Sequence, residues 1–384
     1  MHAPRPRPRG FALLLVLMMS SIVLVLAAEL AYQSNCELLA ARNVSDLGQI
    51  EYAIDGQFEV VLANLRFDKR QNDVDSENDG WASESIRSRR DGDVGLTTRV
   101  FDEQSKFNLT RLVTGSDAEK ARSREVLVRL LDLFRDGIAE DKTRGGDLDV
   151  ADAEDIADRI IRHLKREGAT GQVPKPKLVA PWTDTPMLLD ELLFVDTKDS
   201  RLMSVLLYDV QAKDKVAPGL HRYLTVYGTG KVNLNTAPVA VLKAQFSNLQ
   251  DRDFAQKIVD RRRQAADETS KPSSGSSSSS SSTQDQTGNP YTDVNQLTDG
   301  SVDGLTAEVL QRNGIDPAVV FDVKSDWFGI RIQGATERTQ RDELYVVQRA
   351  KDEDQRDSFR YALHQERTDP LLEAEEDAVS STSG

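Results

Sequence analysis

The feature that most constrains this chain is an uncharged apolar run near its N-terminus. Residues 11–28 read FALLLVLMMSSIVLVLAA. A helix of this length, rising about 1.5 Å per residue, is roughly 27 Å long and can cross the hydrocarbon core of a bilayer. Arg5, Arg7 and Arg9 precede the run, and basic flanks stay on the cytoplasmic side of a membrane. The sequence therefore predicts a single-pass membrane helix over residues 11–28.

A basic segment ending in glycine leads into this run. Arg9-Gly10-Phe11 resembles the leader of type IV prepilins and pseudopilins. In that family a membrane peptidase, the prepilin peptidase, cuts after the glycine, and the new phenylalanine amine is methylated. The resemblance implies a leader over residues 1–10, with cleavage between Gly10 and Phe11. The alternative is a plain secretory signal, since Ala27 and Ala28 weakly mimic a small-residue cleavage site, although such signals have shorter apolar regions.

The fifth residue of the predicted mature chain is Leu15. Most pilins carry Glu there, and a carboxylate inside lipid is costly unless it is paired. In pilins this Glu is thought to neutralise the N-terminal amine of the neighbouring subunit ahead. A subunit at the tip has no such neighbour, and absence of the Glu is a mark of the K-type minor pseudopilin of type II secretion systems. A chance substitution is the alternative.

An apolar stripe continues beyond the predicted span. Its residues follow the spacing of three and four that marks one face of a helix. We favour docking of residues 54–65 on the protein's own domain over docking on a partner helix. The stripe consists of Leu47, Ile50, Ile54, Phe58, Val61 and Leu65.

Further motifs follow in the order seen in the K family. They are an acidic loop before Trp81-Ala82, an alternating strand at residues 94–100, an Asp-Glu turn before Asn108-Leu109, and an Asp-Glu-Leu-Leu turn at residues 190–193. Residues 119–138 and 151–166 have helical patterns, but the second lacks the family's Asp-Trp-x-Asp. Two strands, around residues 328–332 and 344–347, are predicted near the end, joined by a polar connection.

The strongest internal motif is Val232-Asn233-Leu234-Asn235-Thr236-Ala237-Pro238. Asn235 or Thr236 can cap the helix that follows, and Pro238 suits an early helical position because no N–H is needed there. The motif resembles the opening of helix-hairpin-helix DNA binders and of the SAM-like insert of K pseudopilins. Residues 251–263 would be its second helix. We predict that this motif is structural.

The acidic loop is a candidate metal site. Asp73, Asp75, Glu77 and Asp79 offer oxygen ligands within a short segment, and such ligands suit calcium. The loop lacks the twelve-residue EF-hand pattern, so an acidic solvated loop is the competing interpretation. Pseudopilins as a group tend to use calcium, and the resemblance therefore keeps Asp73, Asp75 and Asp79 as candidate ligands.

Composition excludes several function classes. The formal net charge is -14, whereas a phosphate-binding surface gains most of its affinity from Lys and Arg. The balance argues against nucleic acid as a partner, although it does not exclude a local basic patch. The single cysteine cannot form an intramolecular disulfide, and four histidines leave little material for a histidine-based active site. The sequence also lacks zinc spacing, a phosphate loop and a nucleophile elbow, so we predict no enzyme.

Taken together, the motifs imply an α+β fold in which a transmembrane pilin helix packs on an antiparallel sheet. The resemblance adds an inserted all-α SAM-like or helix-hairpin-helix domain. It implies a minor pseudopilin of the inner membrane, with its soluble part in the periplasm, that caps the pseudopilus tip and primes assembly for export across the outer membrane. Its partners would be the I- and J-type minor pseudopilins and the major pseudopilin. The alternative function is a membrane-anchored helix-hairpin-helix DNA-binding protein for DNA uptake.

We expect the following domain boundaries. Residues 29–110 form the pilin-like helix and first strands, and residues 319–350 form the last strands of the same domain. Residues 111–318 form the insert, which contains a flexible Ser-rich loop over residues 268–290. Residues 351–384 are acidic and Ser-rich, and their composition predicts a disordered tail.

Overall fold

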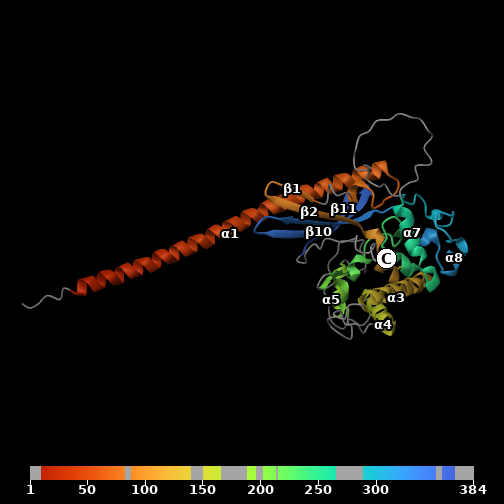
Figure 1. Cartoon of the computed structure of the whole chain (residues 1–384), viewed down its shortest axis with the longest axis horizontal. Coiled ribbons are helices and arrows are strands. Elements are labelled where there is room, and N and C mark those ends of the chain that lie inside the picture. The colour runs from red at the N-terminus through yellow and green to blue at the C-terminus, as the bar shows by residue number, and fades with distance from the viewer. Residues whose placement is uncertain are drawn as a thin grey trace, which may run out of the picture.

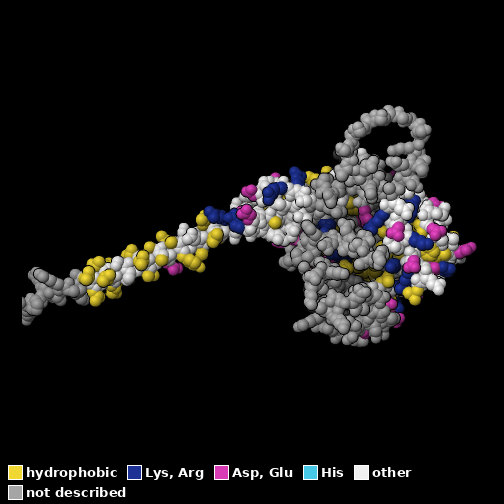
Figure 2. Space-filling model, viewed as in Figure 1, with side chains coloured by type: hydrophobic (Ala, Val, Ile, Leu, Met, Phe, Trp, Pro, Cys, Tyr) yellow, Lys and Arg dark blue, Asp and Glu magenta, His cyan; other side chains and the backbone are white. Residues whose placement is uncertain are grey.

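A long helical shaft carries a rounded head in the computed structural model (Figure 1). The first helix, α1 (Gly10–Gln71), spans 62 residues. Its part from residue 13 to residue 45 is exposed, and hydrophobic side chains cover much of this shaft (Figure 2). Within the described part of the chain, α1 is the one helix long and apolar enough to cross a membrane. The structure describes residues 10–82, 88–139, 150–165, 188–195, 202–212, 215–264, 289–351 and 357–367.

A five-stranded antiparallel sheet lies against the C-terminal half of α1. Its order is β1-β2-β9-β10-β11, so β2 and β9 are neighbours although the whole insert separates them in sequence. The predicted α+β fold with a helix on an antiparallel sheet is therefore confirmed. The strands are β1 (Ser88–Asp91), β2 (Val94–Asp102), β9 (Trp327–Ala335), β10 (Gln340–Lys351) and β11 (Asp357–Arg367).

The apolar stripe of α1 packs on this sheet, as predicted. Ile50, Ile54, Val61 and Leu65 are fully buried and share one core cluster with residues of β2, β9 and β10. The docked segment begins at Asp46, whose carboxylate pairs with Arg338 at 2.9 Å. The same helix is thus a free shaft over its first half and a structural part of the head over its second half.

The prediction that residues 351–384 form a disordered tail is wrong for residues 357–367. These residues form β11, which pairs with β10 along its length. Phe359 packs against the helix–sheet core, and Tyr361 lies near Phe58 with ring centroids 5.8 Å apart. The acidic composition obscured a short alternation of apolar and polar residues, which is the pattern of a half-buried strand. Residues 368–384 lie outside the described residues.

Between β2 and β9 the chain forms a mainly helical insert with its own core. The predicted helices at residues 119–138 and 151–166 correspond to α3 and α4. Three short two-stranded ladders, β3–β6, β4–β5 and β7–β8, accompany the helices, so the insert is not purely α-helical. Most of the Ser-rich loop lies outside the described residues. The helices are α3 (Asp117–Ala139), α4 (Val150–Leu164), α5 (Leu202–Leu207), α6 (Val239–Gln245), α7 (Phe254–Arg263), α8 (Ala307–Arg312) and α9 (Pro317–Val320), and the ladder strands are β3 (Phe107–Asn108), β4 (Val210–Ala212), β5 (Lys215–Ala217), β6 (Leu224–Thr225), β7 (Val232–Asn233) and β8 (Phe321–Asp322).

Candidate functional site

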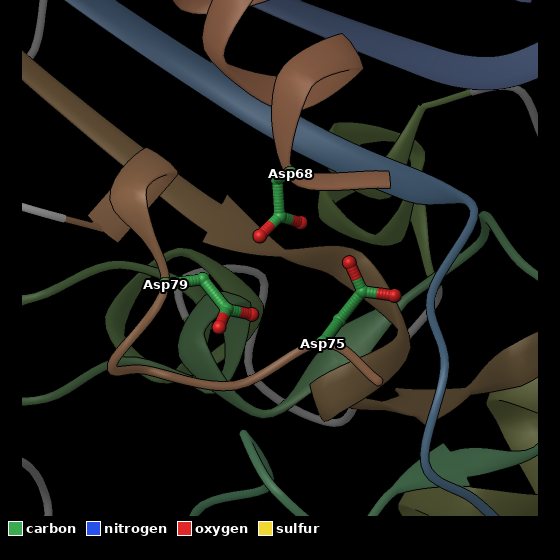
Figure 3. A group of neighbouring side chains, drawn as sticks. All are labelled: Asp68, Asp75 and Asp79. Carbon is green, nitrogen blue, oxygen red and sulfur yellow. The ribbon is translucent and has the colours of Figure 1, made fainter. Parts of the chain in front are cut away.

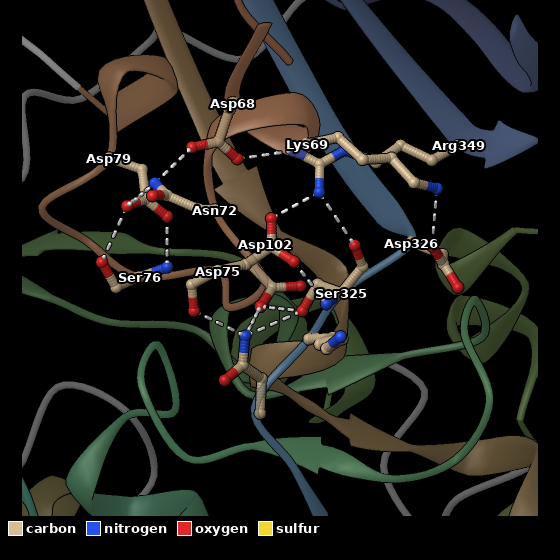
Figure 4. Close-up of polar contacts among 12 residues, drawn as sticks. Asp68, Lys69, Asn72, Asp75, Ser76, Asp79, Asp102, Ser325, Asp326 and Arg349 are labelled. Atoms are coloured by element: carbon tan, nitrogen blue, oxygen red, sulfur yellow. Dashed lines mark hydrogen bonds and ion pairs between the residues drawn. The ribbon is translucent and has the colours of Figure 1, made fainter. Parts of the chain in front are cut away.

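A buried polar junction joins the insert to the pilin-like domain. At its centre is Asp102, the last residue of β2, which is 2% exposed. Its Oδ2 accepts hydrogen bonds from Thr236 Oγ1 at 2.6 Å and from Ser325 Oγ at 2.5 Å. Its Oδ1 accepts one from the Gln104 backbone N–H at 2.7 Å. A single carboxylate therefore joins its own segment to two segments that are distant in sequence (Figure 4).

The motif at residues 232–238, here called the Asn-rich motif, supplies the other half of this junction. Asn233 Nδ2 donates to Asp102 Oδ2 at 3.0 Å, to Ser325 Oγ at 2.9 Å and to the Asp75 carbonyl at 3.1 Å. Asn235 Nδ2 donates to the carbonyl of Tyr291, and its Oδ1 accepts from the same residue's N–H. In this fold the side chains of Asn233 and Asn235 therefore bond to other parts of the same chain.

The predicted helix-capping function of the motif is wrong. Pro238 itself occupies the N-cap of α6, and no side chain caps that helix. Asn235 and Thr236 are buried and are already bound to Tyr291 and Asp102. Ala237 is also fully buried, and its carbonyl accepts a hydrogen bond from Arg262 at 2.9 Å. Because these polar groups are used internally, they are not available to bind the phosphates that a helix-hairpin-helix DNA binder would contact.

Arg349, at the end of β10, lies on the other side of the junction. Its guanidinium pairs with Asp68 at 2.8 Å and with Asp75, and it donates to the Ser325 carbonyl at 3.3 Å. The guanidinium also lies over the Phe328 ring, 4.5 Å from its centroid. Both acids and the arginine are buried, so the ion pairs are shielded from solvent.

Three carboxylates form a compact acidic cluster beside Arg349. Asp68, Asp75 and Asp79 each offer an oxygen, and these oxygens lie within 4.8 Å of one another (Figure 3). Asp79 accepts from the Ser76 N–H at 2.6 Å, which shapes the loop around the cluster. Carboxylate oxygens gathered in this way are ligands that suit calcium.

The sequence identified only part of this cluster. Asp75 and Asp79 were predicted candidates and do come together. Asp73 does not join them, because its exposed carboxylate pairs with Lys324 at 3.4 Å. Asp68 comes from the last turn of α1 and was missed. Its position three residues after the stripe residue Leu65 was the available signal, since residues three apart share a helix face.

Burial disfavours ionisation throughout this region. It raises the pKa of Asp75 to about 6, against the effect of Arg349, and it raises the pKa of Asp102 to about 6. Burial also raises the pKa values of Asp68 and Asp79. Arg349 pairs with only two of these four carboxyl groups, Asp68 and Asp75, so the junction has room for further positive charge, either protons or a bound cation.

The predicted processing residues lie at the other end of the molecule. Gly10 is the first residue of α1 and Phe11 follows it in the helix. Leu15 is 47% exposed on the free shaft. Residues 1–9 lie outside the described residues, so cleavage after Gly10 stays a prediction.

Comparisons with known proteins agree with this architecture. No family model matches the chain. The "Putative type II secretion system protein K" of Escherichia coli (strain K12) is 32% identical over 110 residues, and this match spans 28% of the present chain and 33% of the relative. A chain in the crystal structure of the GspK-GspI-GspJ complex from the enterotoxigenic Escherichia coli type 2 secretion system has the same fold. The TM-score is 0.56 at 16% identity, over 86% of the present chain and 99% of the other.

The fold and the junction define a pilin-like protein with an apolar N-terminal helix and a helical insert between its second strand and the remainder of its sheet. The chain thus shares its fold with a chain of the GspK-GspI-GspJ complex and is similar in sequence to protein K over about a quarter of its length, which agrees with the resemblance that its motifs indicated.

Proposed function

We propose that this chain is a minor pseudopilin that caps the tip of the type II secretion pseudopilus and primes its assembly for export across the outer membrane. The observation that carries the proposal is the exposed apolar half of α1, which is attached to a head wider than the helix–sheet unit alone. Exposed apolar helices can pack side by side in a filament, whereas a bulky head fits best where no subunit lies above it. Leu15 in place of the usual Glu fits the same position.

The partners and the location follow from this proposal. The chain that shares this fold comes from a complex of GspK, GspI and GspJ, which supports the I- and J-type minor pseudopilins as partners. The major pseudopilin would lie below them, and the prepilin peptidase would process the leader. The chain would cross the inner membrane once, with its head in the periplasm. It would act as a structural subunit and not as an enzyme.

The N-terminal peptide of the mature chain tests this proposal. The full chain would be produced in cells with and without the matching prepilin peptidase, and the mass of its N-terminal peptide would be measured. We expect a methylated peptide that begins at Phe11 only when the peptidase is present, and we expect Gly10→Val to block this processing. An intact leader in both strains, or cleavage after Ala28, would contradict the proposal.

A DNA-uptake protein was the alternative, because helix-hairpin-helix DNA binders share the Asn-rich motif. The burial of Asn233, Asn235 and Thr236 within the junction argues against that function. A gel shift with duplex DNA at low salt would separate the two, since non-specific binding depends on accessible phosphate contacts.

A further inference from the structure

An arginine cluster lies on the insert, where α3 meets the end of α6. We define it as Arg111, Arg122, Arg129 and Arg252. Arg129 Nε donates to the Ala244 carbonyl at 2.7 Å, and Arg122 Nη2 donates to Gln245 Oε1 at 3.4 Å. Figure 1 shows α3 on the head, away from the shaft and the sheet. The cluster is therefore separate from the buried junction and from the filament-forming helix.

The four guanidinium groups are close enough to repel one another. Burial, together with the charges of Arg129 and Arg111, lowers the pKa of Arg122 to about 10. Burial also lowers the pKa of Arg129, and the charge of Arg252 adds a smaller effect in the same direction. A pKa of about 10 leaves Arg122 charged near neutral pH. Gathering like charges on a partly buried surface is costly unless an anion offsets them.

The carboxylates of the chain offset only part of this charge. Arg111 lies 3.8 Å from Glu119, and Arg129 lies 3.4 Å from Glu125. Within the described residues, Arg122 and Arg252 form no salt bridge, and the buried Nε of Arg252 donates no hydrogen bond. Two guanidinium groups of the described chain thus lack a salt bridge, although the charge of Glu125 acts on Arg122, in a protein whose net charge is -14.

We propose that the arginine cluster binds a carboxylate-rich peptide segment of a partner protein. The planar fork of each arginine matches the geometry of a carboxylate, and such charge-assisted pairs are the strong ones. A short acidic segment fits the small excess of two unpaired arginines. A long polyanion such as nucleic acid would also meet the repulsion of the acidic chain around the cluster.

The test measures binding of a synthetic oligo-glutamate peptide to the full chain in neutral detergent at low ionic strength. We expect wild type to bind the peptide and added salt to weaken binding. In the double variant Arg122→Gln/Arg252→Gln, we expect the dissociation constant to rise about tenfold or more, since two charge-assisted bonds are lost. The unfolding temperature of the double variant should be unchanged or higher, because repulsion among the arginines is relieved.

The matched control is Arg124→Gln on the same helix. Arg124 pairs with Asp158 at 2.6 Å, so this variant should bind the peptide as wild type does. No binding to wild type, or equal binding by all three proteins, would overturn the proposal. A clearly lower unfolding temperature of the double variant would show that the arginines only hold α3 against α6. Tighter binding of single-stranded DNA than of the peptide, lost in the double variant, would instead assign the cluster to nucleic acid.

Discussion

At the scale of single residues, the buried carboxylate of Asp102 links the insert to the sheet. It accepts hydrogen bonds from Gln104 on its own segment, from Asn233 and Thr236 of the insert, and from Ser325 before β9. A buried network of this kind is worth most when every member has its partner. Asp102 therefore couples the stability of the insert to that of the pilin-like sheet.

We expect Asp102→Asn to lower the free energy of unfolding by about 2–4 kcal/mol. The nitrogen of the new side-chain amide would replace an oxygen that accepts hydrogen bonds, for example from Thr236 and Ser325. The donors would lose their acceptor, and a buried unsatisfied group is costly. Chemical unfolding can be followed by the fluorescence of Trp81 and Trp327, which are both buried. Asp260→Asn on the exposed face of α7 is the control and should change little. Equal stabilities for the two variants would contradict this view of the junction.

The same variant has a predicted pH dependence. Burial raises the pKa of Asp102 to about 6 from 3.8, so its stabilising contribution is complete below the lower value and is lost as pH rises through the higher one. The destabilisation by Asp102→Asn should therefore be larger near pH 5 than near pH 7.5, by roughly 1 kcal/mol. The lowered pKa of His221 opposes this trend equally in both proteins and cancels in the difference. The difference reports Asp102 together with its effect on Asp75, whose charge helps to raise the pKa of Asp102. The reverse trend would mean that hydrogen bonding outweighs burial.

Calcium binding at the acidic cluster is tested by its effect on unfolding. If Asp68, Asp75 and Asp79 hold the ion, adding calcium to chelator-treated protein should stabilise it by about 2–3 kcal/mol at a hundredfold excess over the dissociation constant. Asp79→Asn should abolish this increment, while Asp73→Asn should keep it, because Asp73 lies outside the cluster. Unfolding that is unaffected by calcium or chelator would leave Arg349 and protons as the compensating charges.

At the scale of elements, a glycine in the central strand β9 allows α1 to pack close to the strand backbone. A Cβ built at Gly334 would lie 2.6 Å from Ile50 Cγ2 and 3.2 Å from Ile54 Cγ1. A Cβ at Gly329 would meet the ring of Phe101. The absent side chains therefore let the helix stripe and a neighbouring aromatic ring approach the backbone of the strand.

We expect Gly334→Ala to destabilise the head by about 1–3 kcal/mol, because overpacking shifts side chains in a dense core. The control is Gly95→Ala on β2, where the nearest atom to a new Cβ is the Ala335 carbonyl oxygen at 3.8 Å. Both sites are sheet glycines, so an intrinsic preference of strands for alanine cancels in the comparison. Thermal unfolding in detergent measures the difference. A Gly334→Ala protein as stable as the control would show that α1 shifts at little cost to accommodate the added methyl group.

At the scale of the whole molecule, α1 divides at Asp46. Before it the helix makes no buried contact in the described chain, and after it the helix carries much of the pilin-like core. The part of α1 before Asp46 should therefore contribute little to the stability of the head.

Shortened chains test this division. A chain without residues 1–44 should unfold at the same temperature as the full chain and should not need detergent. A chain without residues 1–56 also loses Asp46, Ile50 and Ile54, and should be destabilised by at least about 3 kcal/mol, given the usual cost of removing buried isoleucines. Equal stability of the two shortened chains would place the boundary further along α1.

The amino-acid sequence by itself determined the features that depend on local pattern. The apolar run, the stripe from Ile50 to Leu65 and the alternation around Ile330 are visible because helices and strands repeat at fixed periods. These predicted the long helix, the strands flanking the insert and the K-like architecture. The prediction of a disordered tail was wrong for β11, because the acidic composition of this short segment concealed its alternation of apolar and polar residues.

Only the tertiary structure decided which distant residues meet. Asp68, Asp102, Asn233 and Arg349 lie far apart in the chain, and no local period links them. Their contacts depend on the antiparallel register of β2, β9 and β10 and on the angle at which α1 ends against the sheet. Asn235 and Thr236 also depend on distant contacts. Their residue types suit a helix cap, but in the folded chain they bond to Tyr291 and Asp102. Burial and charge pairing are properties of the folded chain, which is why the junction emerged only in three dimensions.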